Sequence, residues 1–365
     1  MHKEWPFCHR EVHLLGGAVA INEAESKEVT IWPSTMERKI AVIKIDEYWK
    51  LYEGIMKYGF GIVGVEFITH ASECNGESPP QWRSFSKNGK IWENWNVSQS
   101  WSMISSEAHK AKNGLAYDLS NRISYQLNSV SQSLQDLSIS YRNQLNASVV
   151  KEKFEYQGRF KDMFTEIVYR KFHSFLFDAC ILRDYLCEFM YYFSENGERV
   201  KPDLHITTAG KYFKLLKKYD YLNSLEKEVL DAMSGGWIFE LGAYRDLVMH
   251  SAPISIASHQ LFCIQEQNVM PEEKHVQLIR FPIPSNPDEL YKVRVQKDNF
   301  DRYIEQFEVL AKMAVEDYGK YDCLEYSTGV VEKLSKLAGK IVKISPVKPR
   351  IKTFVDGVNC NVTTS

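Results

Sequence analysis

The apolar residues between Leu119 and Leu145 constrain the fold most strongly. They recur every three or four positions, and Ser, Asn and Gln occupy many of the positions between them. An α-helix has 3.6 residues per turn, so this spacing places all of them on one face. The sequence therefore predicts a long amphipathic helix whose buried face is formed by Leu119, Ile123, Leu127, Val130, Leu134, Leu137, Tyr141 and Leu145.

A second apolar stripe predicts another long helix, which ends at the polar segment "SENGERVKPD". Asp178, Arg183, Asp184 and Glu188 lie within it, and charges of this number cost too much at bilayer depth for a lone membrane span. We expect a buried helix instead, with an apolar face formed by Phe160, Met163, Phe164, Ile167, Val168, Phe172, Phe175, Leu176, Ala179, Leu182, Leu186, Phe189, Met190 and Phe193.

Shorter helical patterns and two strand-like runs follow the long helices. The helical patterns cover about 209–218, 222–233, 236–250 and 299–321, and the strand-like runs are "HQLFCIQEQ" and "HVQLIRFPI". Several helices in succession, interrupted by two short strands, are typical of a bundle with an insertion. We predict an antiparallel helical bundle over residues 96–325, with a β-hairpin inserted at about 258–285.

The two ends of the chain have different patterns. Residues 1–95 predict a small α+β domain, because strand-like runs such as "EVHLLGGAVAI" and "FGIVGVEFI" flank one helical run and a Gly-, Pro- and Ser-rich loop follows. Residues 326–365 are rich in lysine and predict a basic C-terminal tail. The expected fold class is therefore α+β and mainly α.

Composition limits the compartment and the class of partner. The chain has 365 residues, of which 44% are hydrophobic and 25% charged, as in a soluble globular protein. Seven irregularly spaced cysteines, with no charged-then-apolar leader, favour a reduced, cytoplasmic protein without a membrane partner. The net charge of −2 excludes a protein that coats nucleic acid with its whole surface, so any RNA site must be local.

Metal and cofactor signals are weak. "CHREVH" offers Cys8, His9 and His13, but no second half-site with zinc-like spacing accompanies them. The glycine pairs lack the Lys and hydroxyl residues of a nucleotide-binding loop. The sequence therefore predicts neither a metal site nor a cofactor.

The segment "YRDLVMHSAP" carries the strongest chemical signal. Arg245 and His250 lie near the end of a predicted helix, and Pro253 disfavours its continuation. Cleavage of RNA without a metal needs a proton exchanger near neutral pH and a fixed cation beside the phosphate. His250 fits the first role and Arg245 the second, while Asp246 can orient either side chain.

The spacing of this pair indicates a shared site. Five residues on an ideal helix correspond to 500°, which separates the two side chains by about 140°. They converge on one ligand only if the helix end unwinds or a second chain contributes. The same residues also have roles without an enzyme: a histidinium in a last turn is favoured by about 0.3–1 kcal/mol, and Arg245 can pair with Glu240 or Asp246.

"YRDLVMHSAP" resembles the R-x4-6-H motif of the HEPN superfamily, and the resemblance covers a core of about residues 155–325. It implies a helical bundle that dimerises, joins two motifs and cleaves RNA without a metal, in a setting of stress response or antiviral defence. The catalytic residues it implies are Arg245, Asp246 and His250. "HSA" departs from one toxin branch of the superfamily, which has a tyrosine two residues after the histidine.

Two basic segments are candidate RNA contacts. "KYFKLLKKYDYL" mixes lysines with aromatic residues, a combination that can bind a phosphate backbone and stack bases, although such a run is also typical of a solvated helix face. The C-terminal segment has almost no acidic residues and suits phosphate contact. The expected partners are RNA, a second copy of the chain and a regulatory protein; the RNA-binding residues are Lys211, Lys214, Lys217, Lys218, Lys340, Lys343, Lys348 and Arg350.

The sequence leaves a second function open. A helical bundle of this kind can also serve as a non-catalytic interaction or ligand-sensing protein, in which the Arg and His are structural.

Overall fold

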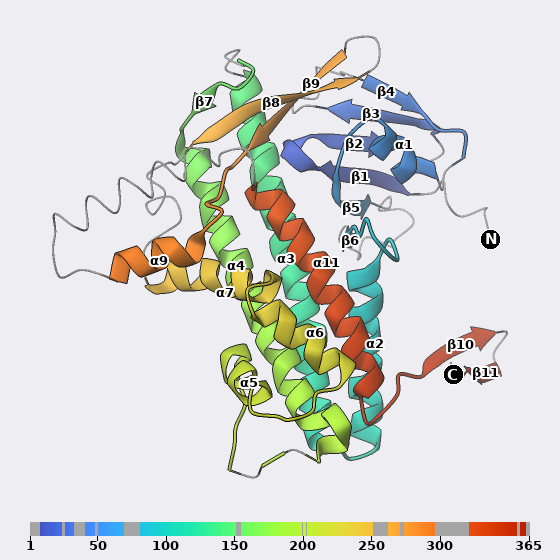
Figure 1. The fold of residues 1–365 in the computed structure, drawn as a ribbon. Coiled ribbons are helices and arrows are strands. Elements are labelled where there is room, and N and C mark those ends of the chain that lie inside the picture. The colour runs from blue at the N-terminus through green and yellow to red at the C-terminus, as the bar shows by residue number, and fades with distance from the viewer. Residues whose placement is uncertain are drawn as a thin grey trace. The chain divides into compact units, whose positions relative to one another are not determined.

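The structure is a computed structural model (Figure 1). It describes residues 8–23, 26–32, 41–47, 50–68, 81–150, 155–198, 200–201, 203–250, 262–270, 274–295, 321–355 and 358–362. These residues form an α+β fold that is mainly helical, as predicted.

Two compact units make up the chain. Unit 1 comprises Met1–Ile91, Gln132–Leu176 and Ala243–Gly329, and unit 2 comprises Trp92–Ser131, Phe177–Gly242 and Val330–Ser365. The predicted domain of residues 1–95 is therefore not separate, because its sheet belongs to the same unit as parts of the helical region.

The N-terminal part of unit 1 is a six-stranded antiparallel sheet with the strand order β4-β3-β2-β1-β5-β6. Strand β1 is one of its two central strands, and its residues alternate between the two faces of the sheet. A short 3-10 turn, η2 (Leu15–Gly17), joins β1 to β2, and helix α1 (Leu51–Lys57) precedes β5. The strands are β1 (His9–Leu14), β2 (Val19–Asn22), β3 (Glu28–Trp32), β4 (Ala41–Lys44), β5 (Ile62–Ile68) and β6 (Gln81–Ser84).

The turn between β1 and β2 needs glycine. Gly16 and Gly17 have φ values of 82° and 86°, in the left-handed region that side chains other than glycine rarely adopt. A Cβ atom on Gly17 would lie 2.9 Å from the carbonyl oxygen of Tyr141. The glycine pair thus allows the sheet to approach the helix backbone closely.

Helix α3 (Gly114–Val150) supplies the cover for one face of the sheet within unit 1. Ser138 contacts β1, and Arg142 forms an ion pair with the same strand. Gln135 donates a hydrogen bond to β5. These three residues lie three and four positions apart, so one face of α3 serves both strands.

The predicted hairpin insertion is present. Strands β8 (Cys263–Met270) and β9 (Lys274–Arg280) pair in antiparallel register, and the two-residue strand β7 (Arg159–Phe160) adds to β8. Residues 251–261, which include Pro253, lie outside the described residues, as do residues 296–320 with most of the helix predicted at 299–321.

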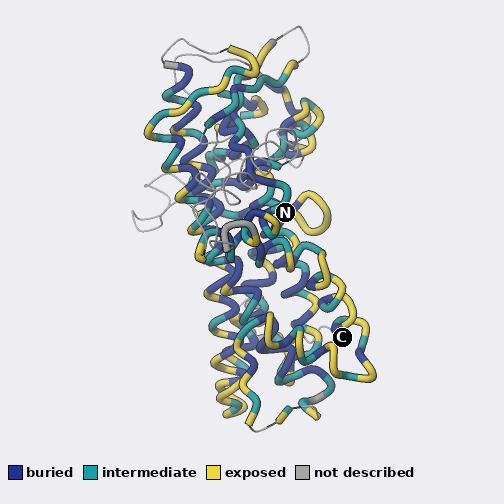
Figure 2. Tube along the Cα trace, turned by 60° about the vertical axis from the view of Figure 1, so that its left-hand side comes forward, coloured by how far each residue is buried: buried dark blue, intermediate teal, exposed yellow. Residues whose placement is uncertain are grey.

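The first apolar stripe is confirmed in full. All eight of its members, from Leu119 to Leu145, have 0% exposure along α3. Figure 2 shows such buried positions recurring along the helices, with exposed positions between them. Helical periodicity alone was sufficient to identify this core face.

The second stripe is confirmed over most of its length but not at its two ends, where Phe164 and Phe193 are half-buried. From Val168 to Met190 its members are fully buried in helix α4 (Met163–Phe193). Phe160 lies in β7 rather than in the helix, and Met163 and Ile167 are 74% and 37% exposed.

Within the described residues, no helix has the length and apolar character needed to cross a membrane.

The C-terminal region differs from the expected tail. Helix α11 (Cys323–Ile341) occupies much of it, and β10 (Ile351–Val355) pairs with β11 (Val358–Val362). Leu334, Leu337 and Ala338 are buried, because they recur at helical spacing among the lysines. This amphipathic helix was not predicted, because the lysine content of the segment was considered rather than the spacing of its apolar residues.

The remaining helices belong to unit 2 or complete the helical region. The 3-10 turn η6 (Val342–Ile344) directly follows α11. The others are α2 (Glu93–Lys110), η4 (Ser194–Gly197), α5 (Ala209–Leu216), α6 (Ser224–Met233), α7 (Trp237–His250) and α9 (Pro287–Val295).

Candidate active site

One face of the C-terminal half of α7 is buried in the core of unit 1. Tyr244 and Leu247 are fully buried, and the Tyr244 hydroxyl donates a hydrogen bond to the carbonyl of Pro284. The Tyr244 ring also packs against Tyr326, with ring centroids 4.9 Å apart. The helix is therefore fixed in rotation, and its other sides are available to carry functional groups.

Arg245 and Asp246 lie beside this buried anchor and form an ion pair. The Nε and Nη2 atoms of Arg245 both donate to Oδ1 of Asp246, at 2.9 Å and 2.5 Å. The two side chains are 28% and 39% exposed. The sequence offered Glu240 or Asp246 as a partner, and the structure selects Asp246. This pairing orients the guanidinium group, and no described residue accepts a hydrogen bond from Nη1, which can therefore donate to an anion.

His250 is the last residue of α7 and is exposed. Among the described residues, none forms a hydrogen bond or an ion pair with its side chain. The helix remains regular through His250, so it does not unwind before the histidine. Arg245 and His250 therefore keep the wide angular separation of an ideal helix, and one chain does not aim both at one ligand.

Asp246 is better placed than Arg245 to reach His250 on the same chain. Residues four apart lie on the same side of a helix, and Asp246 and His250 have this spacing. In the structure Asp246 is engaged with Arg245 instead. Its present role is to position the arginine.

The four lysines predicted near α5 share an exposed surface of unit 2. Lys211, Lys214, Lys217 and Lys218 are all exposed, whereas Tyr212 and Leu216 on the other side of the helix are buried. Phe213 is half-buried, and Nζ of Lys217 lies 4.1 Å from its ring centroid. Nζ of Lys211 lies 3.5 Å from the backbone carbonyl oxygen of His205. The surface therefore exposes four lysines but buries Tyr212, one of the aromatic residues expected to stack on bases.

The C-terminal basic residues are more fully engaged within unit 2. Nζ of Lys340 lies 2.6 Å from the carboxylate of Glu228, and Lys348 donates to the backbone carbonyls of Lys343 and Ser345. Arg350 lies 3.9 Å from Glu107. Lys343 itself is exposed. These contacts reduce the charge available for RNA at this end of the chain.

The structure also brings together residues that the sequence did not connect. Glu11 and His13 on β1 and Glu66 on β5 place one ligand atom each within 4.8 Å of the others. The segment "CHREVH" contributes Glu11 and His13 to this group, but Cys8 and His9, which were considered with His13 from the sequence, are not members of it. Glu66 was missed because its position opposite β1 depends on the strand register.

Neighbouring side chains lower the pKa of both carboxylates of this group. His9, at 3.9 Å, and then Arg142, at 2.8 Å, lower the pKa of Glu11 to about 2 against the effect of burial. His13, followed by Gln135, lowers the pKa of Glu66 below its ordinary value. Both side chains are therefore carboxylates across the neutral pH range.

Comparisons of the chain with protein-family models, with curated proteins and with solved structures each find no match. Any functional proposal for this chain therefore depends on the chemistry of its own residues.

Proposed function

We propose that the chain is a metal-independent endoribonuclease of HEPN type that acts as a homodimer. The observation that supports this most directly is the arrangement on α7. A buried anchor fixes the helix, while a positioned arginine and an exposed histidine lie on its accessible sides. The fold class is compatible with the superfamily resemblance, and the chemistry of these residues matches the reaction.

The proposed reaction is an internal transesterification of RNA. The ribose 2′-oxygen attacks the neighbouring phosphorus, and the bond from phosphorus to the 5′-oxygen breaks. One His250 imidazole accepts the 2′-hydroxyl proton, and a protonated His250 from the second copy donates a proton to the leaving oxygen. The products are a 2′,3′-cyclic phosphate and a 5′-hydroxyl.

Arg245 would stabilise the charge that develops on the phosphoryl oxygens. Its guanidinium group is planar and permanently charged, and Asp246 holds it in one orientation. Nη1 provides N–H donors for a phosphate oxygen. Asp246 therefore acts as a positioning residue, and the lysines beside α5 would bind the RNA backbone.

The test of the reaction uses the full-length protein, single-stranded and hairpin RNAs, and excess EDTA. Cleavage should persist in EDTA, because the proposed reaction uses an imidazole and a guanidinium group and no metal ion. The new ends should be 2′,3′-cyclic phosphates, which resist phosphatase until acid opens the ring. Ends with a 3′-hydroxyl, or loss of cleavage in EDTA, would contradict the proposed mechanism.

A homodimer is the second expected result. The angular separation of Arg245 and His250 requires another copy to complete the site, and Met249 is 53% exposed beside His250. A glutamate placed in a two-fold interface here would bury two like charges, so Met249→Glu should convert a dimer into a monomer in light scattering. Met163→Glu is the matched control, since Met163 is exposed on α4, and it should leave the dimer intact.

The alternative is a non-catalytic interaction or ligand-sensing protein. It is favoured by the Arg245–Asp246 ion pair and by the position of His250 at a helix C-terminus, since both residues then have structural roles. A protein that binds RNA or another ligand as a dimer without cleaving any RNA would support this alternative.

A further inference from the structure

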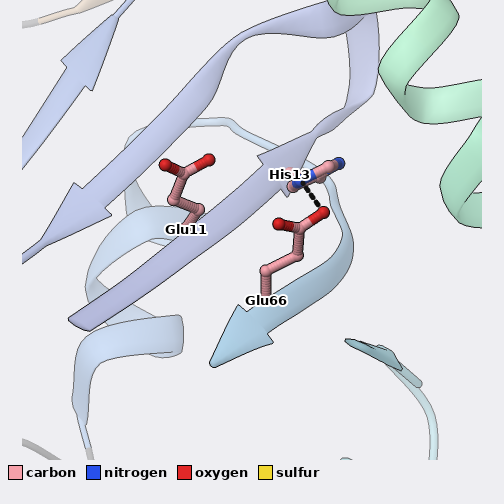
Figure 3. A group of neighbouring side chains, drawn as sticks. All are labelled: Glu11, His13 and Glu66. Atoms are coloured by element: carbon pink, nitrogen blue, oxygen red, sulfur yellow. Dashed lines mark ion pairs between the residues drawn. The ribbon is translucent and has the colours of Figure 1, made fainter. Parts of the chain in front are cut away.

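The register of β1 against β5 gathers three side chains on one face of the sheet. Glu11 and His13 are two residues apart on β1, so they project from the same face. Glu66 on β5 is directly opposite Glu11 in the antiparallel pair. Figure 3 shows the three side chains, which come from elements far apart in the sequence.

Two carboxylates directly opposite each other on paired strands destabilise a sheet unless positive charge is present. Arg142 on α3 supplies one counter-charge through its 2.8 Å contact with Glu11. Among the described residues, the polar groups beside the Glu66 carboxylate include the amide of Gln135, which donates a hydrogen bond at 2.5 Å, and the ring of His13 at 3.4 Å. The His9 ring, 3.9 Å from Glu11, is the other basic neighbour of that carboxylate, so the positive groups lie beside Glu11 rather than beside Glu66.

The second and independent observation is the burial of His13, whose side chain is 2% exposed. Its Nδ1 atom lies 3.0 Å from the hydroxyl of Ser138, and Trp82 packs edge-on against it with ring centroids 5.0 Å apart. Nε2 is buried, is directed toward Glu66, and makes no hydrogen bond with any described residue. A buried ring nitrogen without a hydrogen bond is costly, so a ligand at this position would be stabilising.

The distance from Nε2 to Oε1 of Glu66 is informative. It is 3.4 Å, longer than the roughly 2.7–2.9 Å of a charge-assisted hydrogen bond. Two ligands of a tetrahedral zinc ion, at roughly 2.0–2.2 Å from the metal, lie roughly 3.4 Å apart. The separation therefore fits two atoms that share a metal ion better than two atoms that share a proton.

We propose that Glu11, His13 and Glu66 bind one divalent transition-metal ion of the zinc class. Together they offer one imidazole nitrogen and carboxylate oxygens from two strands. This donor set suits Zn²⁺ and its neighbours, whereas Ca²⁺ takes six to eight oxygen ligands and Mg²⁺ prefers oxygen alone. The ion would join β1 to β5 and leave at least one position for water.

The surroundings have the features of a supporting shell. Ser138 fixes the orientation of the His13 ring, Gln135 holds Glu66, and Arg142 holds Glu11, all from one face of α3. Partners of this kind orient metal ligands and tune their basicity. The Glu11 and Glu66 side chains are 20% and 15% exposed, so an ion can enter from their side. This site is separate from the Arg245/His250 chemistry, for which no metal is proposed.

The test is metal binding by the untagged, full-length protein after treatment with a chelator. Zn²⁺ is titrated in competition with a chromophoric chelator, and Co²⁺ is titrated with its visible absorption recorded. Wild type should bind one ion per chain, and Co²⁺ should give the intense absorption of a four-coordinate site. Zn²⁺ at a hundredfold excess over its dissociation constant should raise the folding equilibrium constant about 100-fold.

Isosteric variants assign the ligands. His13→Gln and Glu66→Gln should each weaken Zn²⁺ binding by more than about 100-fold, and Ser138→Ala by about 10-fold, since outer-shell partners contribute about 10–100-fold. His275→Gln on β9 and Glu28→Gln on β3 are exposed controls and should bind as wild type does. Far-ultraviolet circular dichroism of each variant establishes that it is folded.

Three results would overturn the proposal. The first is that wild type binds neither Zn²⁺ nor Co²⁺ stoichiometrically. The second is that His13→Gln and Glu66→Gln both bind the ion as tightly as wild type does. The third is that Co²⁺ added to wild type keeps the absorption spectrum of the free aqueous ion. If His13→Gln does not fold, Glu66→Gln and Ser138→Ala still decide, because Glu66 is partly exposed and Ser138 does not contact the ion.

Discussion

His250→Ala is expected to lower the rate of RNA cleavage by about 10²–10⁴-fold, because that is the usual contribution of general acid–base catalysis. The fold should be retained, since His250 is exposed at the end of α7 and no described residue bonds to its side chain. The measurement is the single-turnover rate at saturating RNA in EDTA. It separates the chemical step from RNA binding and product release.

Arg245→Lys tests the other half of the site. A lysine keeps the charge but cannot reproduce a planar donor group held by Asp246, so cleavage should slow while RNA binding changes little. His109→Ala and Arg170→Lys are matched controls, because His109 is an exposed histidine in the last turn of α2 and Arg170 is an exposed arginine on α4. Both controls should cleave at the wild-type rate.

The outcomes of these experiments are decisive in different ways. If His250→Ala and Arg245→Lys both match wild type on an RNA that wild type cleaves, the proposed site is wrong. If wild type forms a dimer but cleaves none of a varied set of RNAs, the non-catalytic alternative becomes the better account.

The features predictable from the sequence were those set by local periodicity. The face of α3 from Leu119 to Leu145 and the β8–β9 hairpin follow from the spacing of apolar residues within one element. The same rule, applied to Val330, Leu334, Leu337 and Ile341, would have found α11. The prediction of a basic tail followed the lysine content of this segment and overlooked the apolar residues at helical spacing within it.

The Glu11–His13–Glu66 group was not predictable in this way. A shift of one residue in the register of β5 would turn Glu66 to the opposite face of the sheet. The register depends on the whole sheet, in which β5 pairs with β1 although three strands and α1 separate them in the sequence. A metal-ligand search limited to short spacings found Cys8, His9 and His13, of which only His13 belongs to the group.

Asp322 leads to the second large prediction, because it is a buried carboxylate on which three elements depend. Its side chain accepts hydrogen bonds from the Tyr141 hydroxyl at 2.7 Å and from the backbone N–H of Phe281 at 2.8 Å. It also accepts from the N–H groups of Leu324 and Glu325, at 2.9 Å and 3.0 Å, which caps the start of α11. Burial raises the pKa of Asp322, while the hydrogen bonds favour its ionised form.

Asp322→Ala should lower the free energy of unfolding by about 4 kcal/mol, since it leaves a buried hydroxyl and a buried N–H group of Phe281 without an acceptor. The measurement is urea denaturation followed by circular dichroism. Asp288→Ala on α9 is the matched control, because Asp288 pairs with the exposed Lys292 and surface pairs of this kind contribute little to stability. Equal losses in the two variants would contradict the role assigned to Asp322.

A double-mutant cycle with Tyr141→Phe isolates the bond between the two buried side chains. Tyr141→Phe alone should destabilise the protein by about 1–3 kcal/mol, and by clearly less in the Asp322→Ala background, since the partner is already absent. Because Asp322 also caps α11, hydrogen exchange at the amides of Leu324 and Glu325 should accelerate in Asp322→Ala but much less in Tyr141→Phe. Additive losses in the cycle would mean that the two residues stabilise the protein independently, despite their 2.7 Å contact.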